Sequence, residues 1–162
     1  MIAAAFALCG YAASAPGSPQ TAHFIWNVTA SAPIGLYRIR RDRAPERGDL
    51  VLAIPAPSLA AFAARRGYLP LGVPLVKRIA AAAGDTVCAR GADIFIKGHL
   101  AATRLVADGA GRVLPAWAGC RRLRRGEVFL LMADVRASFD GRYFGPTSAS
   151  RIVGTLEPIW TR

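Results

Sequence analysis

The chain has little cysteine and little histidine, two residue types that often build metal centres and active sites. Of its 162 residues, three are cysteine and two are histidine. Cys9, Cys88 and Cys120 are widely spaced and form no cluster with His23 or His99, which excludes a zinc site of the usual ligand spacing. Neither histidine has the sequence context of a Ser-His-Asp hydrolase. Metal catalysis and a histidine-based triad are therefore excluded.

The sequence also lacks a long hydrophobic run. No window reaches the roughly 20 apolar residues of a membrane span, which excludes a polytopic membrane protein. Residues 1–16 are small, apolar and uncharged, and they end in an Ala-x-Ala-like run. This pattern predicts the end of a membrane anchor or a secretory signal without its basic start, with a buried N-terminal helix as the alternative. Residues 17–22 are predicted to be a linker, and residues 23–162 a single domain.

Lysine is the third scarce residue type. Of 21 basic residues only Lys77 and Lys97 are lysines, and the formal net charge is +11. Where arginine is the usual cation, a retained lysine can serve a purpose that arginine cannot, because a desolvated lysine loses its proton and arginine does not. The charge suits nucleic acid or an anionic membrane surface. No helix-turn-helix, zinc-finger or RNA-recognition signature is present, so we expect the membrane surface rather than nucleic acid as partner.

Most of the chain shows the pattern of short strands separated by Gly and Pro turns. We expect one short helix that is capped by Ser58, runs through Arg66 and is stopped by Gly67. The pattern predicts a mainly β fold, either a folded sheet or a barrel, with that single helix. The predicted strands cover residues 24–28, 36–39, 49–54, 73–79, 93–97, 127–132 and 152–160.

One serine and one lysine are candidates for covalent catalysis. Ser31 lies on a turn directly after a predicted strand, where a nucleophile would be accessible. Lys77 shares a strand face with Leu75 and Ile79, whereas Arg78 points the other way. Burial on an apolar face lowers the pKa of a lysine, and a neutral amine can act as general base for a serine hydroxyl. The alternative is a lysine at a strand edge whose stem extends to water.

Four blocks of sequence occur in a fixed order between residues 24 and 160. They are Asn27–Tyr37, Gly48–Val51, Val76–Ile79 with Gly84-Asp85 following, and Ser138–Pro146. Together they resemble the bacterial type I signal peptidase superfamily, and within it the TraF-type conjugal transfer peptidases. The resemblance implies a signal-peptidase-like folded β-sheet or barrel. It also implies a membrane-associated serine endopeptidase with a Ser-Lys dyad, no metal and no cofactor.

The same resemblance implies roles for individual residues. They are the nucleophile Ser31, the general base Lys77, an oxyanion-supporting hydroxyl on Thr29, the lysine-orienting Ser138, and the loop-supporting pair Asp140 and Arg142, with Asp134 as a second candidate for the carboxylate. The sequence departs from the family pattern in two places. Ala83 stands where a proline is common, and Met132–Val135 replaces a Gly-Asp-Asn block. Both departures bear on the loop geometry rather than on the dyad.

The resemblance also suggests that Cys88 and Cys120 meet. It implies an inner-membrane protein with a periplasmic catalytic domain, or a periplasmic protein, and such a location permits a disulfide. The alternative is two buried free thiols. The apolar loop Tyr68–Val73 is expected to line the substrate groove, to touch lipid or to be a packed connector.

For function, the resemblance implies processing of a conjugative pilin precursor, with the conjugative type IV secretion machinery as a partner. Either water or an amine of the same pilin chain would resolve the acyl-enzyme, and the amine would give a cyclic pilin. Three alternatives remain open. The first is a general leader peptidase for exported preproteins, and the second is a self-cleaving repressor-like Ser-Lys domain. The third is a non-catalytic β-barrel binding module, which a Ser31–Lys77 separation far beyond about 3 Å would favour.

Overall fold

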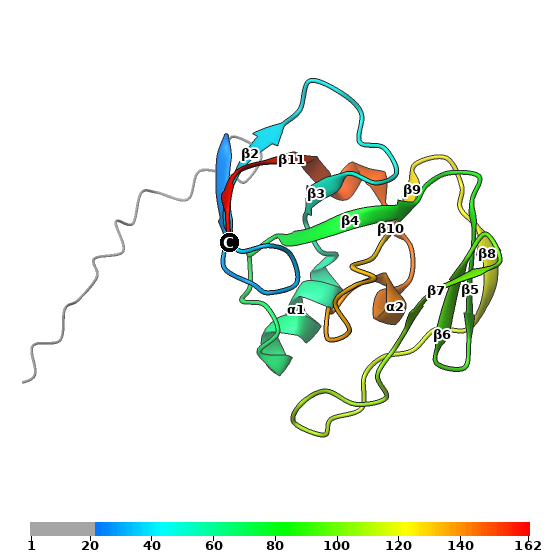
Figure 1. Ribbon diagram of the computed structural model, residues 1–162. Helices are drawn as coiled ribbons and strands as arrows, with labels where there is room; N and C mark the ends of the chain where they lie inside the picture. The colour runs from blue at the N-terminus through cyan, green and yellow to red at the C-terminus, as the bar shows by residue number, and fades with distance from the viewer. Residues whose placement is uncertain (1–21) are drawn as a thin grey trace, which may run out of the picture.

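The computed structural model describes residues 22–162, which form two antiparallel β-sheets and two helices (Figure 1). The predicted anchor or signal segment, residues 1–16, lies outside the described residues, and so does the predicted linker except for Ala22. Among residues 22–162, no helix is long and apolar enough to cross a membrane. The mainly β prediction is confirmed.

The larger sheet has seven strands in the spatial order β1-β2-β11-β3-β4-β9-β10. Their bounds are β1 Phe24–Asn27, β2 Gly35–Arg40, β3 Leu50–Ala53, β4 Leu75–Ala81, β9 Glu127–Leu130, β10 Thr147–Ser148 and β11 Ile152–Thr161. Strand β4 begins at Leu75, two residues later than predicted. Pro74 precedes it, and proline has no N–H to donate to a strand ladder.

The hairpin of β1 and β2 holds the predicted nucleophile in its connection, residues 28–34. Gly35 opens β2 where the backbone of β11 passes very close. A Cβ at this position would lie 2.0 Å from the carbonyl oxygen of Trp160, so only glycine fits. Tyr37, two residues further on, is buried, and its hydroxyl donates to the Pro33 carbonyl at 2.6 Å. The β2 side of the turn is therefore fixed by a close backbone contact and by a side-chain hydrogen bond.

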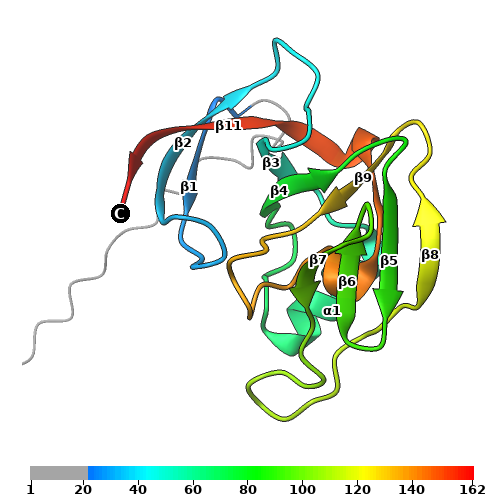
Figure 2. The same ribbon diagram turned by 45° about the vertical axis from the view of Figure 1, so that its right-hand side comes forward.

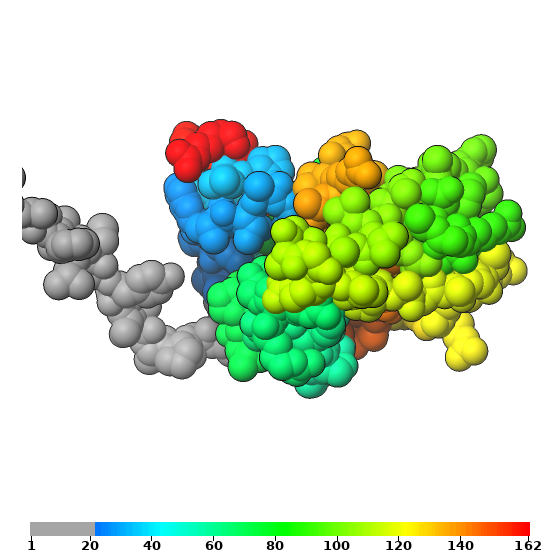
Figure 3. All heavy atoms as spheres, turned by 90° about the horizontal axis from the view of Figure 1, so that it is seen from below, coloured from blue at the N-terminus to red at the C-terminus, as the bar shows by residue number. Residues whose placement is uncertain are grey.

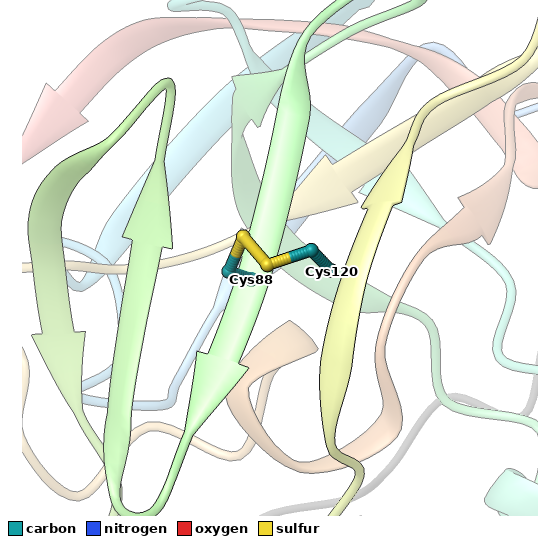
Figure 4. The surroundings of a disulfide bond; sticks show 2 residues. All are labelled: Cys88 and Cys120. Carbon is teal, nitrogen blue, oxygen red and sulfur yellow. A yellow bond between two sulfur atoms is a disulfide. The ribbon is translucent and has the colours of Figure 1, made fainter.

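The smaller sheet lies at the other end of the molecule, as Figures 1 and 2 show, and has the strand order β7-β6-β5-β8. Its strands are β5 Thr86–Arg90, β6 Asp93–Ile96, β7 His99–Thr103 and β8 Gly119–Arg122. The predicted hairpin at Lys97-Gly98 is confirmed, and both turn residues have positive φ, as a tight two-residue hairpin turn requires. Cys88 and Cys120 face each other across β5 and β8 and form a disulfide, the pairing that the resemblance implied (Figure 4).

Both helices lie below strands β4 and β9 in the views of Figures 1 and 2. Helix α1 spans Pro57–Arg66 and ends at Gly67, whose left-handed conformation confirms the predicted stop. The predicted cap at Ser58 is wrong. Ala56 is the cap residue, and its methyl group cannot accept a hydrogen bond from the first turn. Pro57 begins the helix instead, because its fixed φ suits the first helical position. The second helix, α2, is a single turn over Gly141–Phe144, capped by Asp140, and was not predicted.

Candidate active site

A cleft of about 330 Å³ is lined mainly by apolar side chains. It lies among strands β1 and β4 and the loops around them. Four stretches of chain contribute to it, within residues 25–31, 68–77, 105–114 and 137–143. Figure 3 shows these stretches gathered on one face of the molecule, with the N-terminal strands in blue and the segment near residue 137 in orange. All four stretches are separate in sequence, so the cleft is a product of the fold.

Ser31 and Lys77 both line this cleft. The Lys77 amine donates a hydrogen bond to Ser31 Oγ at 3.0 Å, which is within reach for proton transfer. Lys77 is 3% exposed, and its strand neighbour Arg78 is exposed, as the alternation of the strand predicts. Ser31 lies on the turn and is half-buried. The separation expected of a non-catalytic binding module is therefore absent.

Burial lowers the pKa of Lys77 from its ordinary value of 10.5 to about 8. Two further groups act on the amine with opposite signs, since the Asp140 carboxylate raises the pKa and the Arg142 guanidinium lowers it. A pKa of about 8 leaves a usable neutral fraction of the amine near neutral pH. Lys77 can then accept a proton from the Ser31 hydroxyl.

Thr29 adjoins Ser31, as the resemblance implied, and its hydroxyl lies 3.1 Å from Ser31 Oγ. The Thr29 hydroxyl also donates to Asn27 Oδ1 at 2.9 Å, and so does the Thr29 backbone N–H at 3.1 Å. Asn27 is a functional candidate that the sequence motifs did not predict. Its signal was its rarity, since it is the only asparagine in the chain.

The loop on the other side of the cleft is organised by Asp140 and Arg142, which are 0% and 1% exposed. The Arg142 guanidinium binds both carboxylate oxygens of Asp140, at 2.8 and 3.0 Å. It also donates to the carbonyls of Met132, Val135 and Arg136. One ion pair therefore ties the segment after β9 to the segment before α2.

The structure separates the two carboxylate candidates and qualifies the role expected of Ser138. Asp134 is exposed, whereas the buried Asp140 is the carboxylate that acts on the pKa of Lys77. Ser138 is buried in the wall of the cleft, but its hydroxyl has no hydrogen-bond partner within the part of the chain that the structure describes. The expected hydrogen bond from Ser138 to Lys77 is therefore not formed in this structure.

The remaining candidates lie around the site rather than in it. Tyr68, Leu69 and Val73 line the cleft, which supports the groove interpretation of their loop, whereas Leu71 is exposed. The Cys88–Cys120 disulfide is not part of the cleft. Within residues 22–162, no group of three or more His, Cys, Asp or Glu side chains could hold a metal ion.

Comparison with known proteins gives a consistent result. The family model "Signal peptidase, peptidase S26" matches residues 1–161. A plasmid transfer protein TraF from Escherichia coli is 38% identical over 148 residues, covering 83% of this chain and 81% of that protein. The conjugal transfer protein TraF of Agrobacterium fabrum is 39% identical over 147 residues, with the same shares covered. A crystal structure of a signal peptidase I from Enterococcus faecalis is 21% identical and has a TM-score of 0.42, covering 74% of this chain and 100% of that one.

Proposed function

Because the chain belongs to the signal peptidase family, peptidase S26, we propose that it is a serine endopeptidase that cleaves exported precursor proteins with a Ser31–Lys77 dyad. The observation that carries the proposal is the 3.0 Å hydrogen bond between Ser31 Oγ and the buried Lys77 amine. Two residues that lie 46 positions apart in sequence meet in one cleft, and burial gives the lysine a pKa of about 8. Nucleophilic catalysis by serine needs such an adjacent base.

In the proposed reaction, neutral Lys77 takes the proton of Ser31 as Oγ attacks the scissile carbonyl carbon. The resulting oxyanion is bound by the Ser31 backbone N–H and by the Thr29 hydroxyl, which turns toward it. The lysine ammonium then gives its proton to the departing amine as the peptide bond breaks, which leaves an acyl ester on Ser31. Water attacks this ester, passes a proton to Lys77 and releases the product acid as Ser31 recovers its proton.

The cleft suits an extended peptide with apolar side chains. Strand β1 is the edge of the larger sheet as residues 22–162 form it, and residues 25–27 of that strand line the cleft. An extended substrate can pair with such an edge through backbone hydrogen bonds. Ile25, Val73, Leu75 and Leu105 provide an apolar wall. We therefore expect cleavage after a segment with small or apolar residues at alternate positions.

The relatives are named for plasmid transfer and conjugal transfer. In that context we propose a conjugative pilin precursor as the substrate and the conjugative type IV secretion machinery as the partner. An amine of the same pilin chain could replace water in the second step, and the product would then be cyclic. A disulfide is typical of oxidising compartments, which supports an inner-membrane protein with a periplasmic catalytic domain, or a periplasmic protein. The net charge of +11 fits an anionic membrane surface.

The proposal is tested by producing the protein together with a conjugative pilin precursor and measuring the mass of the pilin. We expect a shortened pilin with the wild-type chain and the intact precursor with Ser31→Ala. A product lighter than the linear form by one water indicates cyclisation. Equal cleavage of an ordinary secreted preprotein would instead favour the general leader peptidase, and cleavage that persists in Ser31→Ala would overturn the dyad.

Location provides the second discrimination. We expect cell fractionation to recover the protein with the membrane or the periplasm. Recovery in the cytosol would revive the self-cleaving repressor-like interpretation.

A further inference from the structure

We propose that Asn27 is the positioning residue of the nucleophile: its side-chain amide closes the turn of residues 28–34 and orients the Thr29 hydroxyl against Ser31 Oγ. The inference rests on the proposed Ser31 chemistry and adds a residue that acts on it through Thr29. Asn27 lines the same cleft and is 4% exposed.

The two ends of the Asn27 amide perform different tasks. Its Nδ2 group donates to the carbonyls of Thr29 at 3.0 Å, Ala32 at 3.1 Å and Pro33 at 3.0 Å. These carbonyls lie on both sides of Ser31, so one side chain holds the turn together across the nucleophile. Backbone hydrogen bonding adds a long contact from the Ala32 N–H to the Thr29 carbonyl at 3.5 Å and a bond from the Arg162 N–H to the Ile34 carbonyl at 3.0 Å. The Tyr37 hydroxyl also donates to the Pro33 carbonyl, at 2.6 Å. Next to Ser31 itself, the turn therefore depends mainly on the Asn27 side chain for its shape.

The other end of the amide, Oδ1, accepts from the Thr29 N–H at 3.1 Å and from the Thr29 hydroxyl at 2.9 Å. An amide oxygen has no hydrogen to give, so the hydroxyl hydrogen of Thr29 points at Asn27. Thr29 Oγ1 can then only accept at its 3.1 Å contact with Ser31 Oγ. With Lys77 donating to Ser31 at 3.0 Å, the hydrogen bonds run in one direction, from Lys77 through Ser31 and Thr29 to Asn27.

This direction has a consequence for the order of events. While Lys77 is protonated, Ser31 keeps its hydroxyl hydrogen and donates it to Thr29 Oγ1. The serine is then positioned by this hydrogen bond but is not activated. Once Lys77 is neutral, the Ser31 hydroxyl can turn to the amine, while Asn27 keeps Thr29 and the turn in place. The Thr29 hydroxyl is then free to exchange its Asn27 partner for the developing oxyanion.

Only an asparagine combines these properties in this space. Aspartate has the same shape, but it cannot donate to the three carbonyls, and its charge would favour the ammonium form of Lys77. Alanine leaves the Ala32 carbonyl and the Thr29 N–H without the partner that Asn27 supplies, and it leaves the Thr29 carbonyl with only its long backbone contact. The chain contains a single asparagine, and it stands at this position.

The test is a double-mutant cycle on the rate at which a serine-directed acylating probe labels Ser31 in the purified protein. Asn27→Ala is expected to slow labelling about 10²-fold, the size of effect that a small misplacement of a reacting group produces. Thr29→Val is expected to slow it about tenfold or more, because Ser31 loses the partner that orients it. Because Asn27 acts through Thr29, the double variant should be no slower than Asn27→Ala alone.

The controls separate positioning from loss of structure. Thr29→Ser keeps the hydroxyl and should label at nearly the wild-type rate. Thr155→Val removes a hydroxyl from another buried threonine, far along the sequence in β11, and should leave the rate unchanged. Melting temperatures of all variants identify any that unfold. If Asn27→Ala does not fold, Asn27→Asp is used in its place. The aspartate side chain has nearly the size of asparagine, and the expected rate of Ser31 labelling is equally low.

Three outcomes would overturn the inference while leaving the dyad intact. They are strictly multiplicative effects in the cycle, a wild-type rate for Thr29→Val, and a wild-type rate for a folded Asn27 variant. Failure of the dyad itself would look different, because the wild-type protein would then fail to be labelled at Ser31, or Ser31→Ala would still be labelled.

Discussion

The turn that carries Ser31 and the loop that carries Ser138 flank the same cleft and are held together by different chemistry. A neutral amide, Asn27, holds the first through hydrogen bonds to three carbonyls and to Thr29. A fully buried ion pair, Asp140 with Arg142, holds the second through three further carbonyls. Both devices gather carbonyl groups of a connecting segment, but only one of them is charged.

The difference is explained by what lies between the loops. A single buried charge near Lys77 would shift the pKa of the amine strongly in one direction. The Asp140–Arg142 pair has no such effect, because the carboxylate raises the pKa of Lys77 and the guanidinium lowers it. Burial is then the main cause of the lowered pKa. A neutral amide on the Ser31 side adds no charge at all. The comparison teaches that both loops are fixed by buried polar groups that place little net charge beside Lys77.

The largest effect is expected from removing the two side chains that meet in the cleft between the loops, Ser31 and Lys77. Ser31→Ala and Lys77→Arg should each reduce precursor cleavage by about 10⁴-fold or more, as removal of a nucleophile or its base does in other serine peptidases. Arginine keeps the positive charge but cannot deprotonate. Lys97→Arg is the matched control, because Lys97 is exposed at a hairpin and pairs only loosely with Asp85. Cleavage by Lys77→Arg at the rate of Lys97→Arg would contradict the assignment of the base.

The next largest effect is expected from breaking the buried Asp140–Arg142 ion pair, and it should appear in the free energy of unfolding. Arg142→Met leaves the Asp140 carboxylate buried without its partner, which should lower the free energy of unfolding by about 3–5 kcal/mol. Arg40→Met breaks exposed pairs with Asp42 and Glu157 and should cost no more than about 1 kcal/mol. Urea unfolding of both variants at pH 7 measures the difference. Equal losses would show that burial of the ion pair does not distinguish this loop.

The disulfide lies outside both loops and outside the cleft. Its removal should therefore lower the stability of the protein without changing its activity. Replacing Cys88 and Cys120 by serine opens a loop with a sequence separation of 32 residues and should cost about 3–4 kcal/mol in the chain-entropy model. Below the lowered melting temperature, cleavage should continue at the wild-type rate. Thermal unfolding with and without reductant measures the first effect. A folded variant that has lost activity would show that the smaller sheet also shapes the cleft.

Stability should also report the cost of burying Lys77 between the two loops. Lys77 has a pKa of about 8 when folded and an ordinary value of 10.5. Below pH 8 the folded protein holds a buried charge, so Lys77→Met should raise the free energy of unfolding at pH 7 by on the order of 3 kcal/mol. Between pH 8 and 10.5 the folded wild-type lysine is neutral while the unfolded one still binds a proton, so wild-type stability rises with pH and the gap closes. Urea unfolding at pH 7 and pH 10.5 should show this closure, and a gap that is independent of pH would contradict it.

The smallest expected effect is the dependence of the rate on pH. Since only neutral Lys77 can accept the Ser31 proton, kcat/KM should rise about tenfold per pH unit below pH 8 and level off above it. A short peptide substrate without titratable side chains isolates this change from titration of the substrate. A rate that is flat from pH 6 to 8 would contradict a lysine base that titrates near 8.

Much of the architecture was predictable because local patterns agree with the fold. The stop at Gly67 and the Lys97-Gly98 hairpin follow from backbone conformations that glycine favours. Lys77 was found because strand alternation placed it on the apolar face and its exposed neighbour Arg78 on the other. Strands β5, β8 and β10 escaped prediction. All four residues of β8 are exposed, so it lacks the apolar pattern of a buried strand, and its pairing depends on β5.

The supporting residues of the site were less predictable. Asp134 and Asp140 lie in the same stretch of sequence, and only the fold places one at the surface and the other beside Arg142. Asn27 looked like an ordinary residue at the end of a strand. Its five hydrogen bonds form only once the turn of residues 28–34 has closed around it.

The sequence by itself determined the mainly β character, the order of the motif blocks and the choice of lysine at position 77, because strand periodicity, the conformations open to glycine and the ability of lysine but not arginine to lose a proton are properties of the residue types. The tertiary structure alone decided that Ser31 and Lys77 lie 3.0 Å apart, that Lys77 has a pKa of about 8, and that an uncharged amide and a balanced ion pair flank them. Distances and desolvation depend on every segment that closes the cleft, and those segments come from four separate parts of the chain.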